Sequence, residues 1–302
     1  MQNNNHTTFI MTPLLKILKE TVTACVGIGT GVETQSISEY VLQTTFLKMT
    51  GASEQKLKCI CWEIATYDYD YRYRYLKKNY GECSSYEDKN FIYKDLIDAI
   101  KKNNDSFSVS SIFKDIDITD KTSDYIDNIL IKQAIKNQEN KSGKPMSEEN
   151  KAKMKVGMKK HYMLKGICQD GIDTIQRTCL IEHVNKELIS NINTSLLIVW
   201  KQHDYLFYEK NWRNMFQPQY AMSELFDANM QNRYKNIVYT HRNRCAHNLL
   251  SYQNNLPTLK TLANEEYDYE NYFFRFAILM LIDEIFMRLY KEYLQSLEKH
   301  IM

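Results

Sequence analysis

The 302-residue chain contains few of the residues that make tight turns, with nine glycines and four prolines. These are about 3% and 1% of the chain, against usual fractions near 7% and 5%. Parallel α/β folds and β-sandwiches place glycine and proline in their many turns, so this scarcity disfavours both classes. It favours long helices with few connections, and we expect an all-α fold.

The seven cysteines form no pattern typical of disulfides or of metal sites. Their number is odd, their spacing is irregular, and no CxxC pair occurs. Such thiols are typical of a reducing compartment, so we expect a cytoplasmic protein without a metal or another cofactor. No stretch is apolar enough to span a membrane, and the polar first six residues do not resemble a signal peptide. We therefore expect no membrane contact.

The net charge is +2, which is too small for a protein that coats nucleic acid. Any contact with RNA would therefore come from a local basic patch. One candidate is the polar segment NKSGKPMSEENKAKMKVGMKKHY, which carries a set of lysines with no acid among them: Lys151, Lys153, Lys155, Lys159 and Lys160. Two interpretations are open, a solvated loop or helix, and a basic arm that holds a phosphate backbone. In the second interpretation, Lys159 and Lys160 bind the substrate.

The patterning divides the chain into three regions: an N-terminal helical region over 1–105, a polar and partly mobile insertion over 106–165, and a helical bundle over 166–302. In the last region we expect four helices, over 172–191, 195–216, 222–247 and 267–299. Helices of this length with short connections are typical of a bundle. The buried stripe expected in the last helix consists of Phe273, Phe276, Ala277, Met280, Ile285 and Leu289.

Two helices are expected in the N-terminal region, over 36–49 and 53–78, with Gly51 between them. The second contains the string YDYDYRYRY at 67–75, whose alternation by itself suggests a strand. Because Asp68 lies four residues before Arg72, the charges favour a helix. The tyrosines then form a packing stripe, although stacking on nucleic-acid bases is an alternative.

The densest group of reactive side chains lies in the string YTHRNRCAHN, where apolar periodicity ends. It consists of His241, Arg242, Asn243, Arg244 and His247. Such groups are costly to bury without partners, so a cleft or an interface is the expected setting. RNA cleavage without a metal needs a group that moves a proton and a cation that stabilises the phosphoryl oxygens. Histidine titrates near neutral pH, and the arginine fork matches phosphate.

The spacing constrains how Arg242 and His247 could act together. Five positions on an unbroken helix separate two side chains by about 140°. The pair could face one substrate if the helix ended between them, or if a second subunit supplied its own pair.

The string from Arg242 to His247 resembles the R-x4-6-H signature of the HEPN family (higher eukaryote and prokaryote nucleotide-binding), including the polar residue straight after the arginine. The resemblance covers about residues 222–299 and implies a HEPN-like helical bundle that dimerises and places both pairs in a shared cleft. Many members are metal-independent ribonucleases in toxin–antitoxin, abortive-infection and CRISPR-linked defence.

By that resemblance, Arg242 would hold the phosphate, His247 would transfer a proton, and Asn243 would orient the pair. Apart from the resemblance, Arg244 and His241 are candidate substrate-binding residues; the alternatives are a salt bridge for Arg244 and a flanking or interface position for His241. The implied function is endoribonuclease cleavage of single-stranded or loop RNA by a toxin or anti-phage effector, with an antitoxin or defence protein as a further partner. The alternative is a non-catalytic HEPN-like module that binds a nucleotide or a protein.

Three further interpretations concern the motif itself. In a purely structural one, Arg242 and His247 cap a helix end and pair with acids from 251–270. A second match to the spacing, Arg177 to His183, lacks the amide after the arginine and is discounted. Cys245 falls where an apolar core position is due and is expected to be inert.

Overall fold

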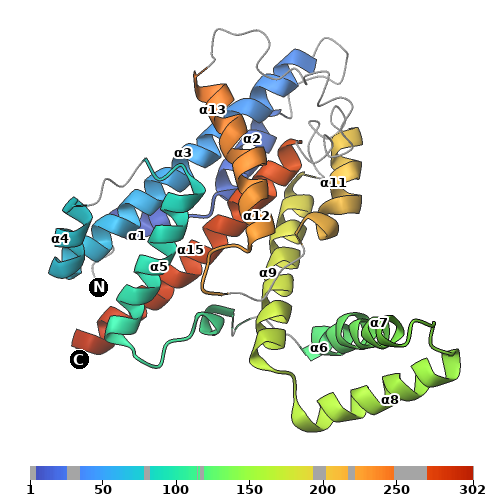
Figure 1. Ribbon diagram of the computed structural model, residues 1–302. Helices are drawn as coiled ribbons and strands as arrows, with labels where there is room; N and C mark the ends of the chain where they lie inside the picture. The colour runs from blue at the N-terminus through green and yellow to red at the C-terminus, as the bar shows by residue number, and fades with distance from the viewer. Residues whose placement is uncertain are drawn as a thin grey trace. The chain divides into compact units, whose positions relative to one another are not determined.

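The computed structural model describes residues 5–25, 35–77, 82–113, 115, 119–192, 202–216, 222–247 and 271–301. Within these ranges the chain is all-α, with helices, short 3-10 and π-helical turns, and no strand (Figure 1). The expected fold class is confirmed at this level. The chain divides into two compact units, a main unit of 1–112, 181–217 and 222–302, and a second unit of 113–180 with 218–221.

The main unit is built around its C-terminal helix, α15 (Tyr272–Ile301). The six residues of the expected stripe are all buried, and so are most of the residues between them, including Phe274, Ile278 and Ile282, whereas Glu284 and Arg288 are partly exposed. A helix that is apolar around most of its circumference must be covered by other elements on several sides. Among the described elements, the most extensive contacts with α15 come from α3 (Gln35–Tyr67), α5 (Tyr86–Asn103), α11 (Gln202–Met215) and the π-helical segment η4 (Tyr234–Tyr239).

The N-terminal helices supply much of this cover, and they belong to the same unit as α15. The sequence left open whether the first hundred residues form a domain of their own or complete the C-terminal bundle. Polarity along the chain separates solvated from apolar segments, but it does not reveal which distant helices pack together. The apolar surface of α15 draws α3 and α5 into one core with the C-terminal residues.

Helix α3 (Gln35–Tyr67) runs without interruption through Gly51, so the expected break there is wrong. Glycine inside a helix costs about 1 kcal/mol relative to alanine. Met49 and Leu57, on either side of it, are buried, so packing of the flanking turns offsets that cost.

The break falls instead at Asp68, before α4 (Tyr69–Lys77). The Asp68 carboxylate accepts a hydrogen bond from the backbone N–H of Tyr71 at 3.0 Å, which satisfies a donor at the start of the new helix. The tyrosine-rich string is thus helical apart from this break. Tyr71 is buried with its ring 5.8 Å from that of Tyr75, whereas Tyr67 is exposed.

Helix α5 (Tyr86–Asn103) begins with a strong capping signal. The Ser85 hydroxyl accepts from the N–H of Asp88 at 3.0 Å, and Glu87 and Asp88 lie in the first turn. Acidic residues at a helix N-terminus are favoured by the helix dipole. This helix was not anticipated from the sequence.

The second unit contains α6 (Thr119–Tyr125), α7 (Ile131–Ser142), α8 (Glu148–Lys165) and the first part of α9 (Gln169–Ile192). The lysine-rich segment therefore forms the end of α7, a turn over 143–147 and most of α8. Across both units, no described helix combines the length and the apolar character needed to cross a membrane.

Candidate functional site

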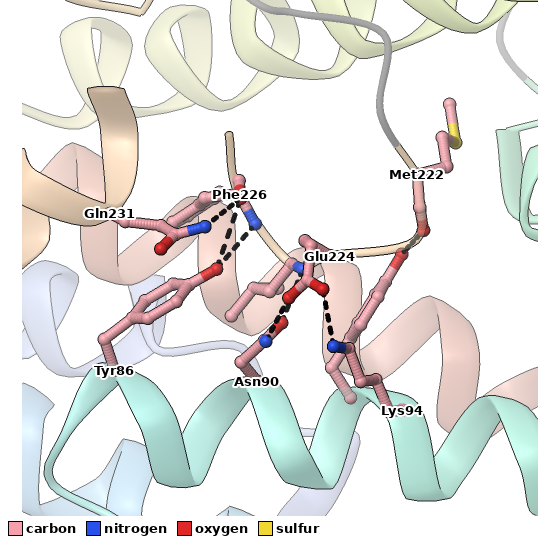
Figure 2. Close-up of polar contacts among 9 residues, drawn as sticks. Tyr86, Asn90, Lys94, Met222, Glu224, Phe226 and Gln231 are labelled. Carbon is pink, nitrogen blue, oxygen red and sulfur yellow. Dashed lines mark hydrogen bonds and ion pairs between the residues drawn. The ribbon is translucent and has the colours of Figure 1, made fainter. Parts of the chain in front are cut away.

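The segment that leads into the motif is anchored on α5 (Figure 2). The Tyr86 hydroxyl accepts from the N–H of Phe226 at 3.1 Å and donates to its carbonyl at 3.3 Å. One turn on, the Asn90 amide donates to the Glu224 carboxylate, which also receives Lys94 Nζ at 2.5 Å. These bonds, spaced along one face of α5, fix where the following helix begins.

Three segments then form one helical run: α12 (Ala228–Arg233), the π-helical η4 (Tyr234–Tyr239) and α13 (Thr240–His247). A π-helical turn frees backbone groups from the regular ladder and is often found at functional sites. Here Arg275 of α15 donates from Nε to the Ile237 carbonyl at 3.0 Å. The irregular turn directly precedes the motif, and α15 supports it.

Arg242 lies on α13 with 23% of its side chain exposed, and its guanidinium is held by two partners. Nη2 donates to Oε2 of Glu54, on α3, at 3.2 Å, and Nη1 donates to Oδ1 of Asn243 at 3.2 Å. A guanidinium carries five N–H donors. Within the described part of the chain, Glu54 and Asn243 engage two of these donors.

The structural interpretation of Arg242 needed an acidic partner from residues 251–270, which lie outside the described residues. The carboxylate observed belongs to Glu54, which is 188 positions away in the chain. No local pattern connects such distant residues. Glu54 is the member of the site that sequence reasoning missed.

Further charges surround Glu54. Lys58, one turn further along α3, pairs with Glu82. Lys89 of α5 is almost fully buried, with its Nζ 2.5 Å from the Cys83 carbonyl. Burial lowers the pKa of Lys89 to about 8, while the negative charge of Glu54 opposes that shift and Arg242 adds to it. Arg242 thus lies at the edge of an internal charge cluster.

His247 is the last residue of α13, and its side chain lies outside the described part of the structure. The helix does not end between Arg242 and His247, so their positions remain about 140° apart. Around the helix axis, Asn243 lies between these two positions. It follows Arg242 by one residue, and position 247 lies one helical turn beyond it on the same face. One of the two expected routes to a shared substrate, an intervening helix end, is therefore absent.

His241 is enclosed by the core. Its Nε2 lies 3.1 Å from the Tyr272 hydroxyl and 3.4 Å from Cys245 Sγ, and its ring is 5.2 Å from that of Phe46. Burial, aided by the charges of Arg275 and Arg244, lowers the pKa of His241 to about 3, so the ring is neutral. His241 therefore packs in the core, and its buried side chain is not accessible to RNA.

The remaining motif residues separate clearly by exposure. Cys245 is fully buried, and burial raises the pKa of its thiol, in agreement with the inert core position expected for it. Arg244 is exposed.

The two lysines expected to bind substrate lie in the second unit. There, Lys159 is paired with Asp127 at 2.7 Å, whereas Lys160 is exposed.

No three histidine, cysteine or acidic side chains come together at ligand distance among the described residues. Comparisons with protein-family models, curated proteins and solved structures found no match. Fold and site together define an all-α protein with a partly exposed arginine, held by a carboxylate and an amide, near the end of a helix.

Proposed function

We propose that this chain is a metal-independent endoribonuclease of the HEPN type that cleaves single-stranded or loop RNA as a toxin or anti-phage effector. One observation carries the proposal. The Arg242 guanidinium is fixed by Glu54 and Asn243 at the surface of the helix that ends with His247. An arginine held in advance can stabilise charge on a phosphoryl group without reorganising during the reaction.

The proposed chemistry assigns one step to each residue. His247 moves the proton of the 2′-hydroxyl or of the leaving group, which histidine can do near neutral pH. Arg242 binds the phosphoryl oxygens with its guanidinium. Asn243 accepts a hydrogen bond from Arg242 and shares a helix face with position 247, so it orients the pair.

A homodimer follows from the helix geometry. Because α13 continues as far as His247, one copy presents the arginine and the histidine about 140° apart. A second copy, packed through the surface that carries Arg242, would bring its own pair into a shared cleft. We expect sedimentation velocity at micromolar concentration to show a dimer. A strictly monomeric and fully active protein would contradict the shared cleft.

A non-catalytic binding module is the second candidate, and the ion pair favours it. Glu54 offsets the charge of Arg242, as in a structural pair that needs no substrate. Incubation of the purified protein with total RNA and EDTA separates the two candidates. Cleavage that survives chelation is expected for the ribonuclease. Intact RNA together with saturable nucleotide binding would support the module and remove the proposed activity.

A further inference from the structure

The charge of the protein is concentrated in one helical hairpin, formed by α7 and α8. Residues 131–165 contain ten lysines and three glutamates, a net charge of +7, whereas the whole chain carries +2. The rest of the chain is therefore net negative. A local field of this size, rather than the total charge, governs the encounter with a polyanion.

The hairpin has a defined structure. Helix α7 ends at Gly143, whose φ of +64° is the left-handed conformation that glycine adopts without strain. Helix α8 is capped by Ser147, the residue before it, whose hydroxyl accepts from the N–H of Asn150. The hairpin is closed by a salt bridge of 3.4 Å between Lys151 and Glu139.

The acids of this unit neutralise only some of the lysines. Lys151 pairs with Glu139 and Glu148, Lys153 with Glu149 at 2.6 Å, and Lys159 with Asp127. Seven other lysines are exposed and form no ion pair within the residues that the structure describes: Lys132, Lys136, Lys141, Lys144, Lys155, Lys160 and Lys165. These seven are called the hairpin lysines. Lys159, expected from sequence to bind substrate, is not among them.

The surface of the hairpin fits nucleic acid better than a membrane. A helix that lies on a membrane presents a face of large apolar side chains beside its cationic face. Along α7 and α8 the only exposed large hydrophobic side chain among the described residues is Val156. Solvated lysines without an apolar face bind a phosphate backbone, because contact releases the counterions condensed on it.

We propose that the hairpin lysines bind the phosphate backbone of RNA, independently of base sequence. Lysine acts on phosphate as a mobile point charge and carries no base readout. Helix α8, with 18 residues, is about 27 Å long and can span several phosphates. That the polyanion is RNA rests on the proposed function, whereas the binding surface does not depend on catalysis.

The test measures binding of a fluorescein-labelled, 20-nucleotide single-stranded RNA by anisotropy across a series of KCl concentrations. All proteins carry His247→Ala so that the RNA stays intact. The hairpin variant is K132Q/K136Q/K155Q/K160Q. The control variant, K16Q/K19Q/K48Q/K291Q, removes the same charge from exposed lysines of the main unit. Glutamine preserves helix propensity, and circular dichroism checks the fold of each variant.

Four lost phosphate contacts should lower the slope of log affinity against log salt by roughly 3, and the affinity at 0.1 M KCl by roughly three orders of magnitude. The two-lysine variant K155Q/K160Q should show about half of this reduction in slope, because it removes half as many contacts. The control should keep most of the affinity. Equal weakening of both four-lysine variants, or RNA binding that neither variant changes, would overturn the proposal.

Two further outcomes separate this proposal from its alternatives. Hairpin-dependent binding to phosphatidylglycerol vesicles with unchanged RNA binding would assign the surface to membranes and overturn the proposal. Hairpin-dependent RNA binding, together with no cleavage by the protein that retains His247, would support the binding surface while the proposed nuclease activity failed.

Discussion

Replacing His247 with alanine should lower the rate of RNA cleavage by roughly 10² to 10⁴, because the loss of a positioned general acid or base costs a factor of this size. The rate is measured with purified protein in EDTA. His183→Ala is a matched control, since His183 follows an arginine at a comparable spacing but lies exposed on α9, outside the motif. It should leave the rate unchanged. Equal cleavage by wild type and His247→Ala would remove the catalytic assignment.

The same experiment extends to the groups that hold the phosphate. Arg242→Ala should cost roughly 10² to 10³, the usual effect of removing a donor aimed at developing charge. Glu54→Gln, which keeps the size but removes the charge that holds the guanidinium, should cost less. If Glu54 acts only through Arg242, Glu54→Gln should cause no further loss of cleavage rate in the Arg242→Ala background.

Expression in a bacterial host tests the activity in a cell. The wild-type protein should slow growth, whereas His247→Ala should not.

The fold class could be read from composition because helices need few glycines and prolines, and the core of α15 could be read from its apolar periodicity. The boundaries of the helices could not be read in the same way. Gly51 has a poor helix propensity, yet it lies inside α3, where packing of the flanking turns outweighs that cost. The start of α5 carries a local signal in the sequence, a serine at position 85 followed by two acidic residues.

The candidate site was found from the sequence only in its local part. Arg242, Asn243 and His247 stand in one short string, so their spacing could identify them. Glu54 enters the site through the packing of α3 against α13, which no local pattern encodes. His241 has the chemistry of a site residue, but contacts with Phe46 and other distant residues place it in the core.

A buried ion pair between α3 and α15 should give the largest loss of stability. Lys56 Nζ lies 2.5 Å from Oδ1 of Asp283, whose Oδ2 accepts the backbone N–H of Leu14 at 2.7 Å. The two charged side chains are 6% and 5% exposed. Burial lowers the pKa of Lys56 and raises that of Asp283, while the attraction between them opposes both shifts. The pair is therefore held together against a desolvation cost.

Lys56→Met should lower the free energy of unfolding by about 3–5 kcal/mol, because it leaves Asp283 buried without its cation. The double variant K56M/D283N should recover most of the loss, since the asparagine oxygen still accepts the N–H of Leu14 and no charge remains. Denaturant unfolding followed by tryptophan fluorescence, to which the buried Trp212 contributes, measures both free energies. Lys235→Met breaks an exposed pair with Glu87 and should cost less than about 1 kcal/mol. If Lys56→Met cost no more than that control, the pair would not stabilise the packing of α3 on α15.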